Sequence, residues 1–204
     1  MTKTLQEVYD LFADNYEANR GLFDMSDVFD AFYQRLQGDK GRLLDLGCGA
    51  GEPWAAYFVD RGWQVMGVDF SSRMLELAGR YVPQMRTVTG DMREIRFETE
   101  RFDAVTAIYS LFHVPQRDHQ SLFVDIHRWL VPGGKFLFTY ATSEYTGKLE
   151  FDGHKEFMGQ QLYYSHTSPD RLKKLLVESG FVIESVDYRE IGGETFLWLT
   201  VKAV

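Results

Sequence analysis

The sequence has one cysteine and no long apolar run, and each of these scarcities excludes a class of protein. Cys48 cannot close an internal disulfide, and no histidine or second thiol lies close enough in sequence to suggest a metal site. No segment approaches the ~20 apolar residues of a membrane-spanning helix, and Met1 to Glu7 lack the apolar core of a signal peptide. The sequence therefore predicts a cytoplasmic protein without disulfide, metal or membrane anchor.

Positive charge is also scarce. The chain has 22 basic and 30 acidic residues, a formal net charge of −8, and its longest basic run is Lys173-Lys174. Such a balance repels a phosphate backbone, so we expect no nucleic-acid partner. In contrast, 45% of the 204 residues are hydrophobic, which is enough for the core of one globular domain.

The most informative segment is residues 43–51, where an apolar run ends in glycines at every second position. Leu43 to Leu46 have the character of a buried central strand, and Pro53 fits the first turn of a following helix. Glycine is required where a strand turns abruptly into a helix, because a Cβ would clash with the turn or with a bound ligand. The segment predicts a strand, loop and helix whose backbone lies close to a ligand.

Strand and helix patterns alternate along most of the chain, after two helical patterns at residues 4–17 and 25–37. This alternation predicts an α/β fold with a doubly wound, mostly parallel sheet covered by helices on both faces. Ile191-Gly192-Gly193-Glu194 joins the last two strands, which predicts an antiparallel C-terminal hairpin. The expected strands are 42–46, 64–69, 86–89, 102–109, 135–141, 181–189 and 195–202, and the expected helices are 53–61, 72–81, 119–130 and 168–179.

One segment interrupts the alternation. Residues 142–167 are polar and aromatic, show no clear period and are too long for a simple connector, so we expect a lid or substrate loop. The organisation expected is a single domain over residues 1–204, with a helical cap over about 1–38 and an insertion over about 142–167.

Acidic residues at successive strand ends narrow the choice of ligand. Glu52 occupies the place of the third glycine of a dinucleotide fingerprint, and with Asp45 it favours a ligand with a cationic end. Asp69 ends the second strand eighteen residues after Gly51, where a carboxylate accepts hydrogen bonds from both hydroxyls of a ribose. Asp91 closes the third strand, where its carboxylate can bind the amino group of adenine.

Neighbouring residues complete the expected site. The backbone of Met92 would reach a ring nitrogen of the base, and Phe70 or Met74 would pack on a ring face. A ribose, an adenine and a cationic amino-acid tail together describe S-adenosylmethionine. The acids also have structural alternatives: Asp45 can cap loop amides and Asp69 can cap the next helix. We interpret Asp45 as serving both purposes, and Asp69 and Asp91 as ligand contacts.

In these features the chain resembles the class I S-adenosylmethionine-dependent methyltransferases, with traits of a bacterial small-molecule subgroup, over nearly its whole length. The resemblance rests on Leu43 to Gly51, Gly67-Val68-Asp69-Phe70-Ser71, Gly90-Asp91-Met92, Phe102-Asp103-Ala104-Val105 and Leu130-Val131-Pro132-Gly133-Gly134, in the family's order. It implies the Rossmann-like fold of that family, with a seven-stranded sheet, and S-adenosylmethionine as cofactor. It also implies that Gly47 and Gly49 line the methionine part of the cofactor, and that Ile108 lies beside the sulfonium.

The resemblance extends to the first helical pattern. Tyr9 to Tyr16 looks like the helix that folds over the cofactor in small-molecule members, which would place Tyr16 at the methionine end. Tyr9 and Phe12 share one helical face with Tyr16, and such a stripe is more typical of a core.

Two histidines are candidates for the acceptor side. His113 follows the fourth strand and is either a general base or a histidine that orders the loop by bonding to backbone. His166 ends the insertion beside Tyr163 and Tyr164, which either line an acceptor pocket or cover the sheet. The segment from Glu156 to His166 also resembles one found in the bacterial subgroup.

These features predict an enzyme that methylates an oxygen, nitrogen or carbon of a small molecule, with His113 and His166 as candidate bases. The alternatives are a non-catalytic S-adenosylmethionine-binding sensor or accessory protein and a methyltransferase of a protein substrate. Nucleic-acid methylation is disfavoured, because Ile108-Tyr109-Ser110-Leu111 stands where an Asn/Asp-Pro-Pro-aromatic run would be needed. A dinucleotide-dependent oxidoreductase is disfavoured by Glu52.

Overall fold

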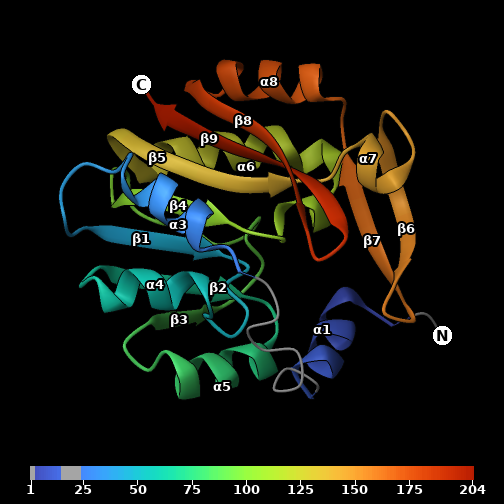
Figure 1. Cartoon of the computed structure of the whole chain (residues 1–204), viewed down its shortest axis with the longest axis horizontal. Helices are drawn as coiled ribbons and strands as arrows, with labels where there is room; N and C mark the ends of the chain where they lie inside the picture. Colours follow the sequence, from blue (N-terminus) through green and yellow to red (C-terminus); the bar gives the residue numbers. More distant parts are fainter. Residues whose placement is uncertain (1–2, 15–23) are drawn as a thin grey trace.

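The computed structural model describes residues 3–14 and 24–204, and its main element is a seven-stranded sheet in the order β3-β2-β1-β4-β5-β9-β8. Strands β1 to β5 run parallel, β9 runs antiparallel to both neighbours, and helices cover both faces (Figure 1). This confirms the predicted α/β, doubly wound, mostly parallel sheet with an antiparallel C-terminal hairpin. The strands are β1 (Arg42–Leu46), β2 (Gln64–Asp69), β3 (Arg86–Thr89), β4 (Phe102–Ala107), β5 (Leu130–Tyr140), β8 (Phe181–Ile191) and β9 (Glu194–Ala203).

The helices in the described part of the chain fall between and before these strands. They are α1 (Leu5–Asp14), α3 (Ser26–Tyr33), α4 (Trp54–Asp60), α5 (Ser72–Tyr81), the short 3-10 helix η1 (Leu111–His113), α6 (Gln116–Trp129), α7 (Ser143–Thr146) and α8 (Pro169–Glu178). Helix α1 begins with a capping box, in which Thr4 and Glu7 each accept a hydrogen bond from the other's backbone N–H.

Side chains of the central strands alternate between two apolar layers. On β1, Leu43 packs in the layer that contains α3 and α4, whereas Leu44 and Leu46 pack in the layer that contains α6 and α8. All three are fully buried, so the strand is apolar at consecutive positions. The strand order reverses between β1 and β4, and such a switch point leaves a crevice beyond the carboxyl ends of the strands.

Several predicted boundaries differ from the observed ones. Strand β4 ends at Ala107 instead of residue 109, because Tyr109 has a φ of +54°, which no extended strand adopts. Strand β5 begins at Leu130 instead of residue 135, and α6 begins at Gln116 instead of residue 119. The last residues of the predicted helix 4–17 lie outside the described residues.

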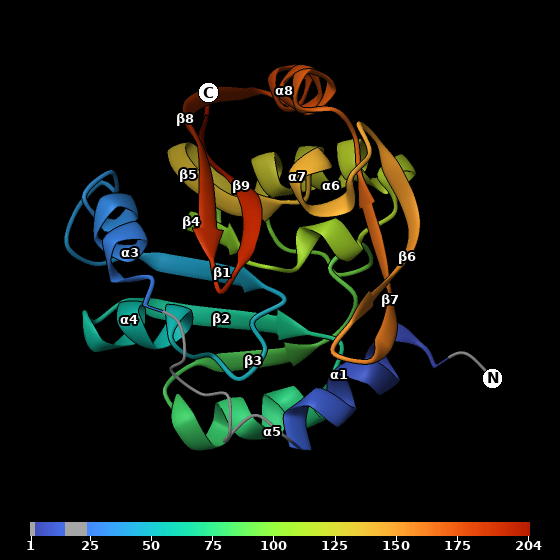
Figure 2. The same ribbon diagram turned by 45° about the vertical axis from the view of Figure 1, so that its right-hand side comes forward.

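Residues 142–167, expected as a lid or substrate loop with no clear period, have regular structure, so the expected lack of a period was wrong. The segment forms α7 and an antiparallel hairpin of β6 (Phe151–Phe157) and β7 (Gln160–His166), joined by Met158 and Gly159 with φ of +49° and +72°. Along β6 partly buried and exposed residues alternate with a period of two. The alternation is not visible in the sequence, because polar and charged residues occupy partly buried positions as well as exposed ones. The hairpin stands beyond the carboxyl ends of the parallel strands, next to α1 (Figure 2), where Leu162 and Tyr164 pack with Val8 of α1.

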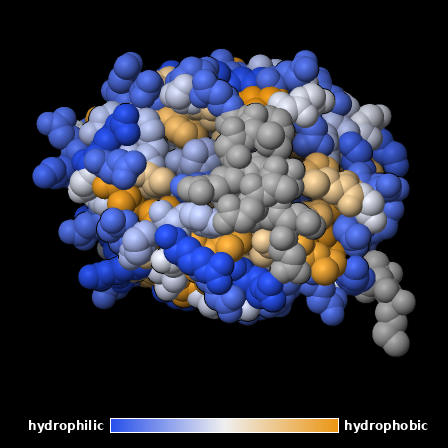
Figure 3. Space-filling model, turned by 60° about the horizontal axis from the view of Figure 1, so that its bottom comes forward, coloured by the Kyte–Doolittle hydropathy of each residue, from blue (hydrophilic) through white to orange (hydrophobic). Residues whose placement is uncertain are grey.

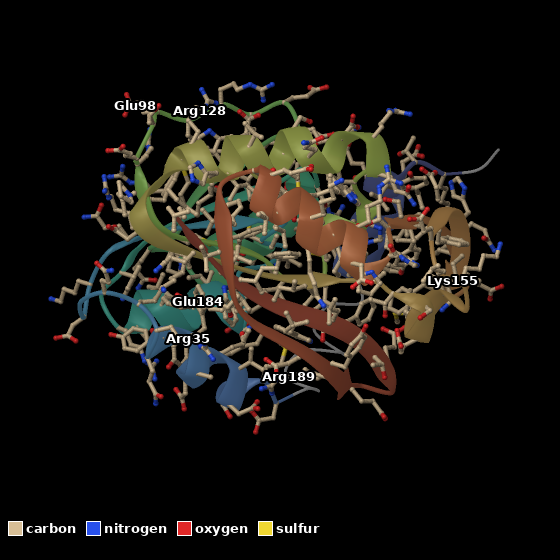
Figure 4. All side chains as sticks on the ribbon, turned by 90° about the horizontal axis from the view of Figure 1, so that it is seen from above. Arg35, Glu98, Arg128, Lys155, Glu184 and Arg189 are labelled. Atoms are coloured by element: carbon tan, nitrogen blue, oxygen red, sulfur yellow. The ribbon has the colours of Figure 1, made fainter. Side chains whose placement is uncertain are left out.

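The face that brings α5 and α1 forward is mainly hydrophilic, with several separate hydrophobic patches (Figure 3). Helix α3 is tied to the far end of the sheet by an ion pair of 2.5 Å between Asp27 and Arg189, which projects from β8 (Figure 4). Within residues 3–14 and 24–204, no helix is long and apolar enough to cross a bilayer. The same residues contain no cluster of three or more histidine, cysteine, aspartate or glutamate side chains arranged to hold a metal.

Candidate active site

A cavity of about 550 Å³ opens at the carboxyl ends of β1 to β4, the position expected from the switch point. Its size lies within the range that holds small organic ligands. Seven of the ten residues predicted to bind a cofactor line it: Gly47, Gly49, Asp69, Phe70, Met74, Asp91 and Met92. His113 lines it as well, so the structure brings together most of the predicted site.

The two glycines after β1 let backbone border this cavity. Gly47 has a φ of +76°, and a Cβ added there would lie 2.3 Å from the Cβ of Ser110, so no larger residue fits. Gly49 has a φ of +52°, and a Cβ there would meet nothing within 4 Å. Gly49 therefore presents open backbone to the cavity, which a bound ligand can approach closely.

Asp69 lies beside this loop at the end of β2. Its two carboxylate oxygens accept hydrogen bonds of 2.9 Å from the backbone N–H groups of Gly49 and Ser71. Burial raises the pKa of Asp69, and these hydrogen bonds oppose the rise. A carboxylate has about four acceptor positions, so Asp69 keeps acceptor capacity for a hydroxyl of a ribose beside its backbone hydrogen bonds. The geometry thus fits the predicted ribose contact, whereas the N-cap of α5 is Ser71, whose hydroxyl accepts a hydrogen bond of 3.1 Å from the Met74 N–H.

Asp91 lines the cavity together with Arg93, its partner in an ion pair. Arg93 approaches it at 2.5 Å in a bidentate arrangement and also reaches Asp118 at 3.2 Å. Burial acts to raise the pKa of Asp91, but the hydrogen bonds and charge of Arg93 outweigh it, so the pKa lies below its usual value. Asp91 is therefore held ionised at the predicted adenine position, with its carboxylate hydrogen-bonded to the backbone and guanidinium of Arg93.

His113 links the cavity to two other parts of the chain. Its Nε2 lies 2.8 Å from the hydroxyl oxygen of Tyr9 on α1, and its Nδ1 lies 2.7 Å from the carbonyl oxygen of Tyr163 on β7. Burial lowers the pKa of His113 to about 4, so the ring is neutral near pH 7. His113 thus makes the backbone hydrogen bond of the loop-ordering interpretation, and it also lies at the cavity wall, where a general base would have to be.

The structure does not bring Asp45 or Ile108 to the cavity wall. Asp45 is 3% exposed and accepts a hydrogen bond of 2.7 Å from Thr106, and burial raises its pKa to about 7. The predicted capping of loop amides is wrong, because the N–H groups of Gly47 and Cys48 donate to the carbonyl of Val68. Ile108 instead packs in the apolar layer of α3 and α4.

The other two exceptions are His166 and Tyr16. His166 is fully buried, with Nε2 2.7 Å from the Thr146 hydroxyl and Nδ1 3.2 Å from the Thr167 carbonyl. His166 therefore makes structural contacts within the insertion. Neither it nor Tyr163 or Tyr164 lines the cavity, so the cavity is not the acceptor pocket predicted around these three residues. Tyr16 lies outside the described residues.

Sequence reasoning missed several residues of the cavity wall. Tyr9, which the sequence pattern places in the core although it shares a helical face with Tyr16, lines the cavity. Helix α1 is attached beside the cavity by a hydrogen bond of 2.5 Å from the Ser71 hydroxyl to Asp10. Tyr109 and Ser110 also line the cavity, and the argument that placed His113 after the fourth strand applies equally to them. Ser110 donates to the Leu46 carbonyl at 2.6 Å and so joins the ends of β4 and β1.

Comparison with known proteins gives matches over the same region and over the whole fold. A family model described as a methyltransferase domain matches residues 43–134. A curated demethylmenaquinone methyltransferase of Lactococcus lactis subsp. lactis (strain IL1403) is 27% identical over 221 residues, covering 93% of this chain and 85% of that protein.

Solved structures show the same architecture. The putative S-adenosylmethionine-dependent methyltransferase from Listeria monocytogenes has a TM-score of 0.70 at 21% identity, covering 88% of this chain and 99% of that one. The Burkholderia thailandensis 1,6-didemethyltoxoflavin-N1-methyltransferase, with bound 1,6-didemethyltoxoflavin and S-adenosylhomocysteine, has a TM-score of 0.67 at 20% identity, covering 100% and 92%. At these identities the structural likeness establishes the shared fold.

Proposed function

Because this chain is a class I S-adenosylmethionine-dependent methyltransferase, we propose that the cavity beside Asp69 holds this cofactor and that the acceptor binds next to it against Tyr9, Tyr109 and His113. The observation that carries the proposal is the pairing of Asp69 with the open backbone of Gly49. Together they offer free acceptor capacity on a carboxylate and a close backbone surface at one end of the cavity.

The residues of the chain divide the work along the cavity. Asp69 accepts the ribose hydroxyls, and Asp91, Met92, Phe70 and Met74 surround the base, while Gly47 and Gly49 border the amino-acid end. The cofactor supplies a methyl group on positively charged sulfur, which is already activated toward an attacking lone pair. The protein chiefly aligns the acceptor with that methyl group, and orientation alone can supply several kcal/mol of a reaction barrier.

The acceptor is a small molecule in this proposal, which the demethylmenaquinone methyltransferase and the 1,6-didemethyltoxoflavin bound in the Burkholderia enzyme support. An oxygen, nitrogen or carbon acceptor is compatible with the cavity, and we assign His113 the role of general base. The cap formed by α1 and the insertion with its hairpin belong to one domain in this proposal. The proposal also includes a cytoplasmic location and the absence of a nucleic-acid partner. The net charge of −8 supports the second of these.

Two measurements test the proposal. Titration calorimetry should show that S-adenosylmethionine and S-adenosylhomocysteine bind and that nicotinamide dinucleotides do not. Incubation with methyl-labelled S-adenosylmethionine and a metabolite library should then label a small product. Binding without transfer to any compound or protein would favour the sensor alternative, and failure of both S-adenosyl compounds to bind would overturn the proposal.

A further inference from the structure

The Tyr9 hydroxyl, His113 and the carbonyl of Tyr163 form a continuous hydrogen-bonded row that ends in the cavity. The three residues come from α1, η1 and β7, and the two links measure 2.8 and 2.7 Å. Tyr9 and His113 both line the cavity, and their rings meet edge to face with centroids 5.6 Å apart. The hairpin that the sequence analysis described as a loop thus supplies a backbone group to this row.

The chemistry of these groups fixes the direction of each hydrogen bond. A carbonyl oxygen only accepts, so Nδ1 of His113 carries the proton and donates to Tyr163. In the neutral ring Nε2 is then a lone pair, which accepts the proton of the Tyr9 hydroxyl. Burial raises the pKa of Tyr9, and the nearby Asp69 carboxylate raises it further, so Tyr9 remains a hydroxyl donor.

The hydroxyl oxygen of Tyr9 keeps unused acceptor capacity. Among residues 3–14 and 24–204, its only hydrogen bond is the one it donates to His113. An acceptor molecule in the cavity can therefore donate a hydrogen bond to this oxygen without displacing His113. We call the Tyr163 end of the row closed, because its carbonyl accepts the His113 proton and cannot donate one. We call the Tyr9 end open, because its oxygen can still accept a hydrogen bond.

We propose, building on the methyltransferase function, that Tyr9 is a second catalytic residue, which receives the hydroxyl proton of the acceptor and passes its own proton to His113. As a lone pair of the acceptor oxygen bonds to the methyl carbon, the carbon–sulfur bond breaks and its electron pair stays on sulfur. The acceptor proton moves to the Tyr9 oxygen, and the Tyr9 proton moves to Nε2 of His113. The positive charge thereby passes from sulfur to the imidazolium ring, which donates to Tyr163 and Tyr9.

This relay selects an acceptor with a hydroxyl group. A hydroxyl oxygen that has gained a methyl group but kept its proton is a very strong acid, so even a weakly basic imidazole takes that proton. A methylated alkylamine holds its proton far more tightly and would not release it to such a base. The titratable groups packed against His113 are Tyr9 of α1 and Tyr164 of β7, whose ring centroid lies 4.8 Å away, and neither is ionised near pH 7.

A probe pair tests the open end of the relay. With S-adenosylhomocysteine saturating, 1-naphthol should bind about fivefold more tightly than 1-methoxynaphthalene, the size of one net hydrogen bond. Tyr9→Phe should abolish this preference. The matched control is Tyr140→Phe, which removes a hydroxyl bonded to His119 at 2.9 Å in the core and should keep the preference. Loss of discrimination in Tyr9→Phe alone supports the proposal, and an unchanged preference in Tyr9→Phe overturns it.

Nuclear magnetic resonance of protein with nitrogen-15 histidine tests the closed end, with His113→Asn to identify the signals. The proposal expects a neutral His113 ring protonated at Nδ1, and a proton on Nε2 would overturn it. Calorimetry with S-adenosylhomocysteine separates the two levels of the argument. If that compound binds and the naphthol preference is absent, the relay fails while the methyltransferase function stands; if it does not bind, the proposed function fails.

Discussion

The protein contains the same trio of groups twice, once at the cavity and once in the core. At the cavity, Tyr9 donates to His113, which donates to the carbonyl of Tyr163. In the core, the hydroxyl of Tyr140 meets Nδ1 of His119 at 2.9 Å, and Nε2 of His119 meets the carbonyl of Val114 at 2.8 Å. Burial lowers the pKa of both histidines to about 4. Their residue types and acidity therefore do not distinguish them.

The difference lies in the free capacity of the tyrosine oxygen. Tyr140 is fully buried and already accepts a hydrogen bond of 3.0 Å from the Thr167 N–H, so its hydroxyl has a donor and an acceptor partner inside the protein. Tyr9 faces the cavity, where its oxygen can accept a hydrogen bond from a ligand. The comparison teaches that access to the cavity, and not the identity of the side chains, separates a reactive trio from a structural one.

The largest expected effect concerns the two histidines. His113→Asn should lower the rate of methyl transfer to the hydroxyl compound that the labelling experiment identifies by roughly 10²- to 10⁴-fold, because it removes the final proton acceptor. His119→Asn should leave the rate per folded molecule unchanged. The measurement is single-turnover transfer of labelled methyl, corrected for folded fraction by circular dichroism. Similar rate losses in both variants would erase the distinction between the trios.

The idea of free acceptor capacity extends to Asp69, whose carboxylate faces the cavity. Asp69→Ala should weaken S-adenosylhomocysteine binding by ~1–3 kcal/mol, the cost of losing hydrogen bonds to paired hydroxyls. Calorimetry measures this change, with Asp170→Ala at the exposed start of α8 as the control. Equal affinities for the two variants would remove Asp69 from the cofactor site.

A smaller expected effect is a difference in unfolding free energy between the Tyr140→Phe and Tyr9→Phe variants. Tyr140→Phe leaves the His119 Nδ1 and the Thr167 N–H without a partner in the core, which should cost ~1–3 kcal/mol of unfolding free energy. Tyr9→Phe should cost less, because water in the cavity can replace the hydroxyl at His113. Urea unfolding measures both. A larger loss in Tyr9→Phe would contradict the assignment of the core trio as the structural one.

The smallest expected difference is in the response of the two histidines to acid. A histidine whose pKa falls from about 6.5 in the unfolded chain to about 4 in the folded protein takes up its proton first in the unfolded state. Its contribution to stability is therefore present above pH 6.5 and is lost as pH falls to about 4. His113→Asn and His119→Asn should each flatten the loss of melting temperature over this interval, and by similar amounts. A much flatter profile for one variant would show that the histidines titrate differently.

Much of the fold and part of the site could be predicted from the sequence, for a local reason. Parallel strands buried on both faces leave runs such as Leu43 to Leu46, and a turn that needs positive φ leaves glycine at positions 47 and 49. Asp69 was found because its spacing from the glycines follows from one strand, loop and helix unit. Each of these signals lies within a short stretch of chain.

Local residue patterns suffice to predict the strands and helices of the seven-stranded sheet, the glycine loop and the acid at the end of β2, because neighbouring residues specify them. The packing of the folded chain encloses Asp45 and His166 and leaves Tyr9, Arg93 and His113 at the cavity wall. Tyr9, His113 and Tyr163 are far apart in the chain, and their hydrogen bonds depend on how α1, η1 and β7 pack beyond the sheet. Packing between distant segments sets which polar atoms remain unsatisfied, and no local pattern of residues encodes that.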